Sequence, residues 1–233
     1  MTDERGGPQA IPRPERSRPG GLPAWHGAEH ALVRDLDAVC DRIVGYQPIM
    51  RGGPAVARPP EEGKRSAVLV ALYGGDDGAT LILTRRPQHM RKHAGEIAFP
   101  GGSVDPEDDD LWSTARREAE EEVALDRSLP AYVGALDSFV TGASYSLVQP
   151  LVGRLETLPE LTASPAEVDR IIHTPLTELI TPGVHRIEEW WWNDEWREMH
   201  FFDLVGETVW GATAMMLANL LDVASGVAPN RAG

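Results

Sequence analysis

Apolar side chains recur with two different spacings along this chain, and each spacing predicts a type of secondary structure. In residues 28–44 they return every three or four positions, from Ala31 to Ile43, which predicts an amphipathic helix. Residues 66–73 and 80–86 are short, almost continuously apolar runs separated by a Gly-Gly-Asp-Asp-Gly turn. These features are typical of a buried β-hairpin.

Further elements are predicted after residue 130. The pair Asn193-Asp194 tolerates a left-handed backbone and separates two strand-like runs, so it predicts the turn of a second hairpin. The predicted strands are residues 132–139, 146–155, 184–192 and 195–202, and the predicted helices are residues 175–179 and 215–224.

Composition divides the chain into three zones. Residues 1–24 are rich in Pro, Gly and Arg and have few aliphatic side chains, so burial cannot offset the entropy of ordering and we expect a disordered tail. Residues 25–65 should hold the first helix and, in residues 45–65, an irregular connection with several Pro and Gly. Residues 66–225 should form the main domain, a size that a single core can support.

The stretch of residues 99–125 (FPGGSVDPEDDDLWSTARREAEEEVAL) concentrates the candidate chemistry. A Pro-Gly-Gly loop leads through an acidic turn into a predicted helix. At about 100° per residue, Glu118, Glu121 and Glu122 share one face of this helix, and Glu120 points away from it. Because three like charges on one face repel, this face is either an ordinary solvated acidic surface or a site for a divalent cation.

This stretch resembles the Nudix box, G-x5-E-x7-R-E-U-x-E-E-x-G-U, where U is an aliphatic residue. Residues 117–125 (REAEEEVAL) fill its second half, with Ala124 in place of the family's Gly. The first half is one residue longer when counted from Gly102, and Asp108 or Asp109 stands where Glu is usual. A narrower pattern, GGxxDxxDxxxxxTAxREAxEE, accommodates both departures and is similar to the coenzyme A pyrophosphatase branch of the Nudix hydrolases.

A second stretch, residues 83–102 (LTRRPQHMRKHAGEIAFPGG), resembles another signature of that branch, LTxRSxxLRxHxGxVxFPGG. It departs at Pro87, Met90 and Ile97, and the last two changes keep side-chain volume and apolar character. With WGATA at residues 210–214, the likeness extends from about Ser66 to Val223 of the chain.

The resemblance implies the Nudix fold, an α/β (α+β) architecture with a mixed β-sheet in an α/β/α sandwich. It also implies a Mg²⁺ or Mn²⁺ cofactor held by Glu118, Glu121 and Glu122, with the carbonyl of Gly101 or Gly102 as a further ligand. Carboxylate and carbonyl oxygens are the ligands that such hard cations take in proteins.

Two further residues are predicted to act in catalysis. Arg117 would pair with a box carboxylate and orient it. Glu167 lies at a downstream position where some Nudix enzymes carry the general base, so the base is either this residue or a box glutamate. Because Ser164-Pro165 precede it, Glu167 is equally consistent with a residue in the first turn of a helix.

A cationic segment precedes the acidic one. Residues 78–104 contain several basic side chains and a single acid, Glu96. Arg suits bidentate phosphate contacts, so these side chains either hold the diphosphate or the 3′-phosphate of coenzyme A, or are solvated charges at a strand end. The resemblance favours the first interpretation. The predicted substrate-binding residues are Arg85, Arg86, Arg91, His93 and Gly95.

Composition excludes several classes of protein. The net charge of −14 disfavours a nucleic-acid partner, which requires a basic surface. No apolar run is long enough for a membrane span, and the first residues lack the apolar core of a signal peptide. Cys40 is the only cysteine, which excludes an intramolecular disulfide and fits a cytoplasmic protein.

We therefore expect a metal-dependent diphosphatase that splits coenzyme A or an acyl derivative into 4′-phosphopantetheine, or its acyl form, and adenosine 3′,5′-bisphosphate. One alternative is a general hydrolase of nucleoside-diphosphate derivatives such as ADP-ribose, NADH or a damaged nucleoside triphosphate. Another is a nucleotide-sensing module without catalysis, which would be marked by degenerate box carboxylates. A homodimer is expected by analogy with the family.

Overall fold

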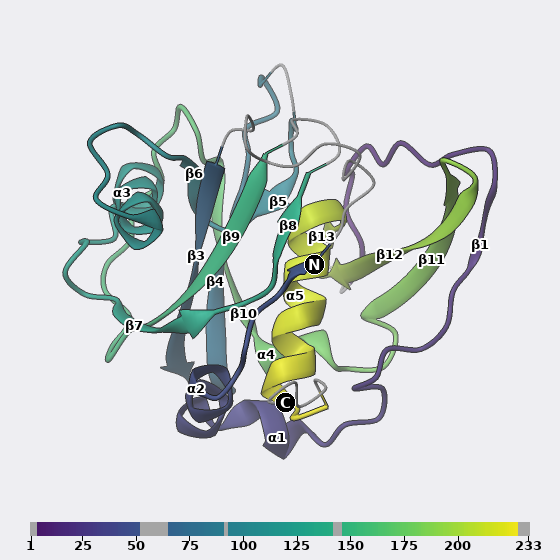
Figure 1. Cartoon of the computed structure of the whole chain (residues 1–233), viewed down its shortest axis with the longest axis horizontal. Coiled ribbons are helices and arrows are strands. Elements are labelled where there is room, and N and C mark those ends of the chain that lie inside the picture. The colour runs from purple at the N-terminus through teal and green to yellow at the C-terminus, as the bar shows by residue number, and fades with distance from the viewer. Residues whose placement is uncertain (1–3, 52–64, 91–92, 142–145, 228–233) are drawn as a thin grey trace.

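The computed structural model describes residues 4–51, 65–90, 93–141 and 146–227. Within these ranges the strands form a mixed nine-stranded sheet and an antiparallel four-stranded sheet. Helix α3 (Leu111–Val123) packs on one face of the larger sheet, and helix α5 (Gly211–Ala224) lies on its other face, between the two sheets (Figure 1). The predicted architecture, a mixed sheet covered by helices on both faces, is confirmed.

The larger sheet contains the first predicted hairpin. Its strands are β2 (Met50–Arg51), β3 (Arg65–Gly75), β4 (Gly78–Arg85), β5 (Ile97–Ala98), β6 (Gly101–Ser103), β7 (Ala131–Ala135), β8 (Ser138–Val140), β9 (Leu147–Arg154) and β10 (Arg170–Pro175). The order is β10-β4-β3-β9-β8-β2, with β5, β6 and β7 added to β4, β3 and β9. The hairpin β3–β4 is confirmed, with Leu72 opposite Leu81.

The smaller sheet contains the second predicted hairpin. Its strands are β1 (Ser17–Pro19), β11 (His185–Trp192), β12 (Glu195–Leu204) and β13 (Glu207–Val209), and the remaining helices are α1 (His30–Arg34), α2 (Leu36–Val44) and α4 (Leu176–Leu179). The β11–β12 turn has Asn193 and Asp194 at φ values of 49° and 62°, the left-handed backbone expected of this pair. No helix in the described ranges has the length and apolar character needed to cross a bilayer.

Strand β3 explains why the larger sheet is covered on both faces. Ala67, Leu69 and Ala71 are buried with side chains of α3, whereas Val70 and Leu72 are buried with side chains of α5. Since successive side chains of a strand point to opposite faces, an almost continuously apolar strand has to be covered on both sides. This packing holds α3, the helix with the candidate carboxylates, against the sheet.

The first helix differs from its prediction. Residues 28–44 form two helices, α1 and α2, rather than one. Asp35 interrupts them because its backbone is extended, and its carboxylate accepts hydrogen bonds from the N–H groups of Asp37 (2.9 Å) and Ala38 (3.2 Å). With this N-cap, α2 begins as a separate helix. Of the predicted connection at residues 45–65, residues 52–64 lie outside the described ranges.

Residues 4–24, expected to be a disordered tail, follow a defined path along the smaller sheet. Strand β1 pairs with β11, with Ser17 opposite Trp190. The Arg16 guanidinium lies 4.2 Å from the ring centroid of Trp191, and the Arg18 guanidinium lies 4.1 Å from that of Trp196. Cation–π and backbone contacts thus replace the aliphatic burial that the composition lacks.

Two histidines lie side by side within the smaller sheet. His185 Nε2 and His200 Nδ1 are 3.0 Å apart. Burial, with the nearby charge of His200, lowers the pKa of His185 to about 3, and burial, with the charge of Arg51, lowers the pKa of His200 to about 4. Both values lie below the unfolded value of about 6.5, so the unfolded chain binds more protons in this range and stability falls as the pH drops below about 6.5.

The variant His200→Gln should therefore lose part of this pH dependence. Between pH 7.5 and pH 5, the free energy of unfolding of the unsubstituted protein should fall by about 1 to 2 kcal/mol more than that of the variant, measured by urea titration. His89→Gln, at an exposed position, should follow the unsubstituted protein. Equal pH slopes for His200→Gln and the unsubstituted protein would contradict the assignment.

Candidate functional site

Helix α3 begins and ends at defined caps. The Asp110 carboxylate accepts a hydrogen bond from the Ser113 N–H at 2.7 Å, an N-cap at the start of the helix. At the other end Ala124 has φ 56° and ψ 31°, and its N–H reaches the carbonyls of Ala119 and Glu120. A left-handed C-cap usually carries Gly, so this conformation explains the family's Gly at the position of Ala124.

Glu122 is the most deeply placed of the three predicted ligands, with 4% of its surface exposed. Its Oε2 accepts a hydrogen bond from the Gly101 N–H at 3.3 Å. Burial raises the pKa of Glu122 to about 8, and the carboxylates of Glu118 and Glu167 act in the same direction. Burial also raises the pKa of Glu118. The site is therefore a partly buried cluster of like charges that favours a cation.

Arg117 lies at the centre of a set of acceptors. Its Nε and Nη2 are each 3.0 Å from an oxygen of Asp108, and its Nη1 is 3.0 Å from Glu118 and 3.2 Å from Glu121. Nη2 also donates to the Ser103 carbonyl at 3.0 Å. The hydrogen bonds from Arg117 hold the pKa of Asp108 well below its usual range. Arg117 thus contacts two of the carboxylates that it is predicted to orient.

Replacing Arg117 with Met should damage both stability and turnover. Asp108, whose side chain is only 5% exposed, would lose its ion-pair partner, which costs about 3 kcal/mol, or roughly 6 to 12 °C in Tm. Losing the orientation of Glu118 and Glu121 should lower kcat by about 10- to 100-fold. Thermal unfolding and steady-state kinetics measure the two effects.

Two further variants serve as controls for Arg117→Met. Arg116→Met should have little effect, because Arg116 donates to the Arg127 carbonyl and lies over Trp112, away from the acidic cluster. The double variant Arg117→Met with Asp108→Asn should recover part of the lost Tm, because no unpaired carboxylate is left. An additive double variant would show that Arg117 does not stabilise the protein through Asp108.

The two glycines of β6 make close contacts that a Cβ would block. A Cβ on Gly102 would lie 2.5 Å from the carboxylate of Glu118, and a Cβ on Gly101 would lie 2.5 Å from the Ala67 carbonyl oxygen. Only glycine permits both approaches. At Gly102, strand β6 therefore lies directly against the Glu118 carboxylate of α3.

The segment before β10 brings Glu167 to the same place. The N–H of Thr162 donates to the Val123 carbonyl at 3.0 Å, and that of Ser164 to the Glu122 carbonyl at 2.8 Å, so the segment is tied to the end of α3. Residues 165–167 form a turn, so the alternative of a helical first turn is wrong. The charge of Glu167 raises the pKa of both Glu118 and Glu122, which reflects its closeness to them.

The adjacent residues Arg85 and Arg86 have different surroundings. Arg85 donates to Asp169 at 2.7 and 2.9 Å and to Glu207 at 2.6 Å, so ion pairs occupy its guanidinium. The buried Nε of Arg86 has no hydrogen-bond partner among the described residues, and its charge lowers the pKa of Glu122. Of the two, Arg86 is the one whose charge acts on the Glu122 carboxylate.

His93 and Gly95, also predicted to bind substrate, lie in the loop after β4. His93 has φ 57° and its Nδ1 lies 2.7 Å from Oε2 of Glu96. Gly95 has φ 71°, a backbone conformation that favours glycine, and a Cβ there would require the end of the flexible Gln88 side chain to move. Arg91 lies outside the described residues.

The donor set fits a hard divalent cation, although it is not arranged as a metal site. Among the described residues, no three Asp, Glu, His or Cys side chains converge as a ligand cluster. Arg117 holds oxygens of Glu118 and Glu121, which directs them to the guanidinium. Glu122, buried beside other carboxylates, nevertheless lacks a neutralising ion pair of 4.0 Å or less in this part of the chain, which fits an added cation.

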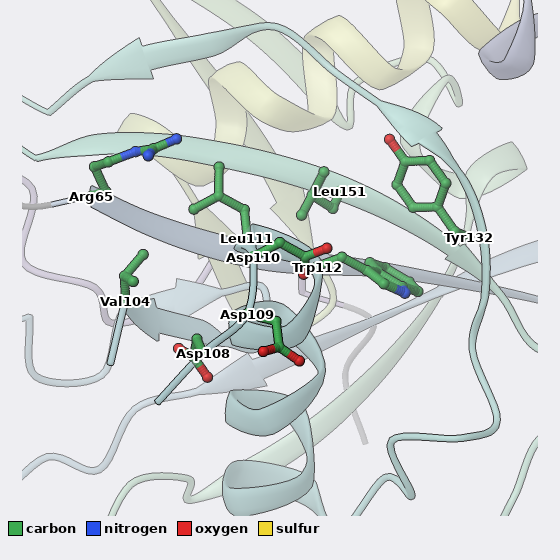
Figure 2. Close-up of a pocket in the computed structure, with 9 residues that line it drawn as sticks. All are labelled: Arg65, Val104, Asp108, Asp109, Asp110, Leu111, Trp112, Tyr132 and Leu151. Carbon is green, nitrogen blue, oxygen red and sulfur yellow. The ribbon is translucent and has the colours of Figure 1, made fainter. Parts of the chain in front are cut away.

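A groove of about 730 Å³ lies at the start of α3 (Figure 2). Figure 2 shows Asp108, Asp109 and Asp110 at the entry to the helix, with Trp112 and Tyr132 beyond them. Among the described residues, none of the predicted site residues lines this groove. Its lining is Arg65, Val104, Asp108, Asp109, Asp110, Leu111, Trp112, Tyr132 and Leu151.

The structure adds polar residues that the site prediction does not contain. Asp108 pairs with Arg117, and the sequence pattern around the box already contains it. Asp169 and Glu207 pair with Arg85, and Gln9 hydrogen-bonds to Glu207. No local pattern marks these three, because they come from distant parts of the chain.

Comparisons with known proteins find a matching family model and several similar sequences. A family model described as the NUDIX domain matches residues 63–203. Nudix hydrolase 22, chloroplastic, of Arabidopsis thaliana is 38% identical over 181 residues, which are 75% of this chain and 58% of the relative. The uncharacterized Nudix hydrolase NudL of Photorhabdus laumondii is 34% identical and aligns over 72% of this chain and 88% of its own length.

A solved structure also matches part of this chain, and two relatives are longer than the part that this chain covers. A C. elegans Ap4A hydrolase in a binary complex aligns over 50% of this chain and 83% of its own, with 20% identity and a TM-score of 0.42. The chain spans 58% of the length of each of two Arabidopsis relatives, Nudix hydrolases 22 and 15.

Proposed function

Because this chain belongs to the Nudix hydrolase family, we propose that it is a metal-dependent diphosphatase whose substrate is coenzyme A or an acyl derivative. The products would be 4′-phosphopantetheine, or its acyl form, and adenosine 3′,5′-bisphosphate. One observation carries the proposal, namely that the signature of residues 83–102 leads directly into a box that keeps Glu118, Glu121 and Glu122. The burial of Glu122 beside Glu118 and Glu167 supports it.

The predicted ligands are Glu118, Glu121 and Glu122, with a carbonyl of Gly101 or Gly102. When bound there, Mg²⁺ or Mn²⁺ supplies charge neutralisation at the phosphoryl oxygens and activates water. Gly102 suits this arrangement because, without a Cβ, its backbone can lie against the Glu118 carboxylate.

The chain's own side chains have three roles in the proposed reaction. Arg117 orients Glu118 and Glu121 through its hydrogen bonds. Arg86 places positive charge beside the acidic cluster, where it can meet a phosphoryl oxygen of the substrate. Glu167 accepts the proton of the attacking water on a carboxylate oxygen as the new P–O bond forms and the leaving phosphate departs.

A substrate panel tests the proposal. Purified protein with Mg²⁺ should hydrolyse coenzyme A with a higher kcat/KM than ADP-ribose, NADH or a damaged nucleoside triphosphate, and mass spectrometry should find adenosine 3′,5′-bisphosphate. Dephospho-coenzyme A, which lacks the 3′-phosphate, should be a poorer substrate. A clear preference for ADP-ribose, NADH or a nucleoside triphosphate would favour the general hydrolase, and binding without turnover would favour a nucleotide sensor.

The proposal also includes an oligomeric state and a cellular location. A homodimer is expected by analogy with the family. A reducing cytoplasm is supported by the single cysteine, Cys40, which is buried as a free thiol.

A further inference from the structure

The N-terminal segment reaches the neighbourhood of the predicted substrate loop. In Figure 1 this purple segment runs from the region of β13 to β1. The Gly6 N–H donates to the Leu204 carbonyl at 2.8 Å, and the Gly206 N–H donates to the Glu4 carbonyl at 3.1 Å. These bonds fix the segment beside the β12–β13 turn and place Gln9 at the start of β13.

The side-chain amide of Gln9 is buried and has partners at both of its polar atoms. Its Nε2 donates to the Gly95 carbonyl at 3.1 Å and to Oε2 of Glu207 at 2.7 Å. Its Oε1 accepts the Thr208 N–H at 2.8 Å. A buried amide with these three bonds is costly to replace, because each partner would be left unsatisfied.

The contacts continue from Glu207 to the segment that carries Glu167. Glu207 is 1% exposed, and its second oxygen accepts from Arg85 at 2.6 Å. Arg85 also donates to Asp169, and the Asp169 N–H donates to the Arg85 carbonyl at 2.8 Å. Asp169 follows Glu167 by two positions. A continuous set of hydrogen bonds thus joins Gly95, through Gln9, Glu207 and Arg85, to the segment of the predicted base.

We propose that Gln9 is a positioning residue, whose amide fixes the loop at Gly95 and the Glu207–Arg85 pair and thereby makes the N-terminal segment a determinant of substrate affinity. This inference rests on the proposed function, because it takes Gly95 and Arg86 as parts of the substrate site. The Gly95 N–H donates to the Arg86 carbonyl at 3.1 Å. The position of Gly95 is therefore linked directly to that of Arg86. Gln9 lies outside residues 63–203, which match the family model.

The variant Gln9→Met tests this role, because Met has a similar length and no hydrogen-bonding amide. Amide hydrogen exchange at Arg86, Gly95 and Glu96 should become about 5- to 10-fold faster, and KM for coenzyme A should rise by a similar factor with kcat nearly unchanged. Gln149→Met is the matched control, since the Gln149 amide donates to the carbonyls of Leu136 and Pro150 and, among the described residues, makes no hydrogen bond to this network.

Three outcomes would overturn the inference. One is unchanged exchange in the loop, and another is an unchanged KM with turnover intact. The third is faster exchange throughout α5 as well as in the loop, since this would indicate a general loss of stability. If the unsubstituted protein hydrolyses no substrate of the panel, the proposed function is wrong, and the exchange comparison of Gln9→Met with Gln149→Met still decides whether Gln9 holds the loop.

Discussion

Replacing Glu122 with Gln should give a folded protein whose kcat is about 10³-fold lower. Gln has the same shape, and Glu122 has no salt bridge of 4.0 Å or less among the described residues, so the substitution removes charge without leaving a partner unpaired. The charge matters for turnover because Glu122 is a predicted metal ligand. Circular dichroism measures the fold, and steady-state kinetics with Mg²⁺ measures kcat.

The matched control for this variant lies on the same helix. Glu120→Gln removes one charge from α3 at a side chain that is 42% exposed and paired with Arg127, away from the cluster. Its kcat should stay within about twofold of that of the unsubstituted protein, because an exposed ion pair contributes little free energy. Unchanged turnover in Glu122→Gln would mean that the metal is held elsewhere.

Replacing Glu167 with Gln should lower kcat by about 10²-fold, at the low end for a general base, because water can partly substitute at an exposed carboxylate. The limb of the pH–rate profile that reports deprotonation of the base should disappear in this variant. Metal affinity, measured by Mn²⁺ titration, should change little, since Glu167 is not among the predicted ligands.

Glu160→Gln is the control for this second variant, because Glu160 is also exposed and lies in the same connection between β9 and β10. It should keep both its kcat and its pH profile. If Glu167→Gln keeps the limb of the profile, the base is a box glutamate, the alternative that the sequence leaves open.

Periodicity was sufficient to predict the elements that hold the site. Helix α3 and the β3–β4 hairpin are both determined by local patterns, namely a polar face beside small apolar residues and a turn between two apolar runs. Local rules succeed here because the determining residues are neighbours in sequence.

The different roles of Arg85 and Arg86 could not be predicted in this way. Adjacent side chains at the end of a strand point to opposite faces, so one of the two arginines must turn away from the carboxylates. Which one does so depends on Asp169 and Glu207, which are 84 and 122 positions away from Arg85. The contacts of the N-terminal segment were missed for a related reason, because composition counts aliphatic burial and ignores partners such as Trp191 for Arg16.

Strand β1 also affects whether molecules of this protein associate with one another at high concentration. It covers β11 and leaves at the border of the smaller sheet a three-residue strand that carries Arg18 and ends at Pro19. A charged side chain and a residue without an N–H make a poor template for strand addition, which protects against aggregation. Proteolytic loss of β1 would uncover the eight-residue β11, in which Trp192 is already 51% exposed, and would favour intermolecular strand pairing.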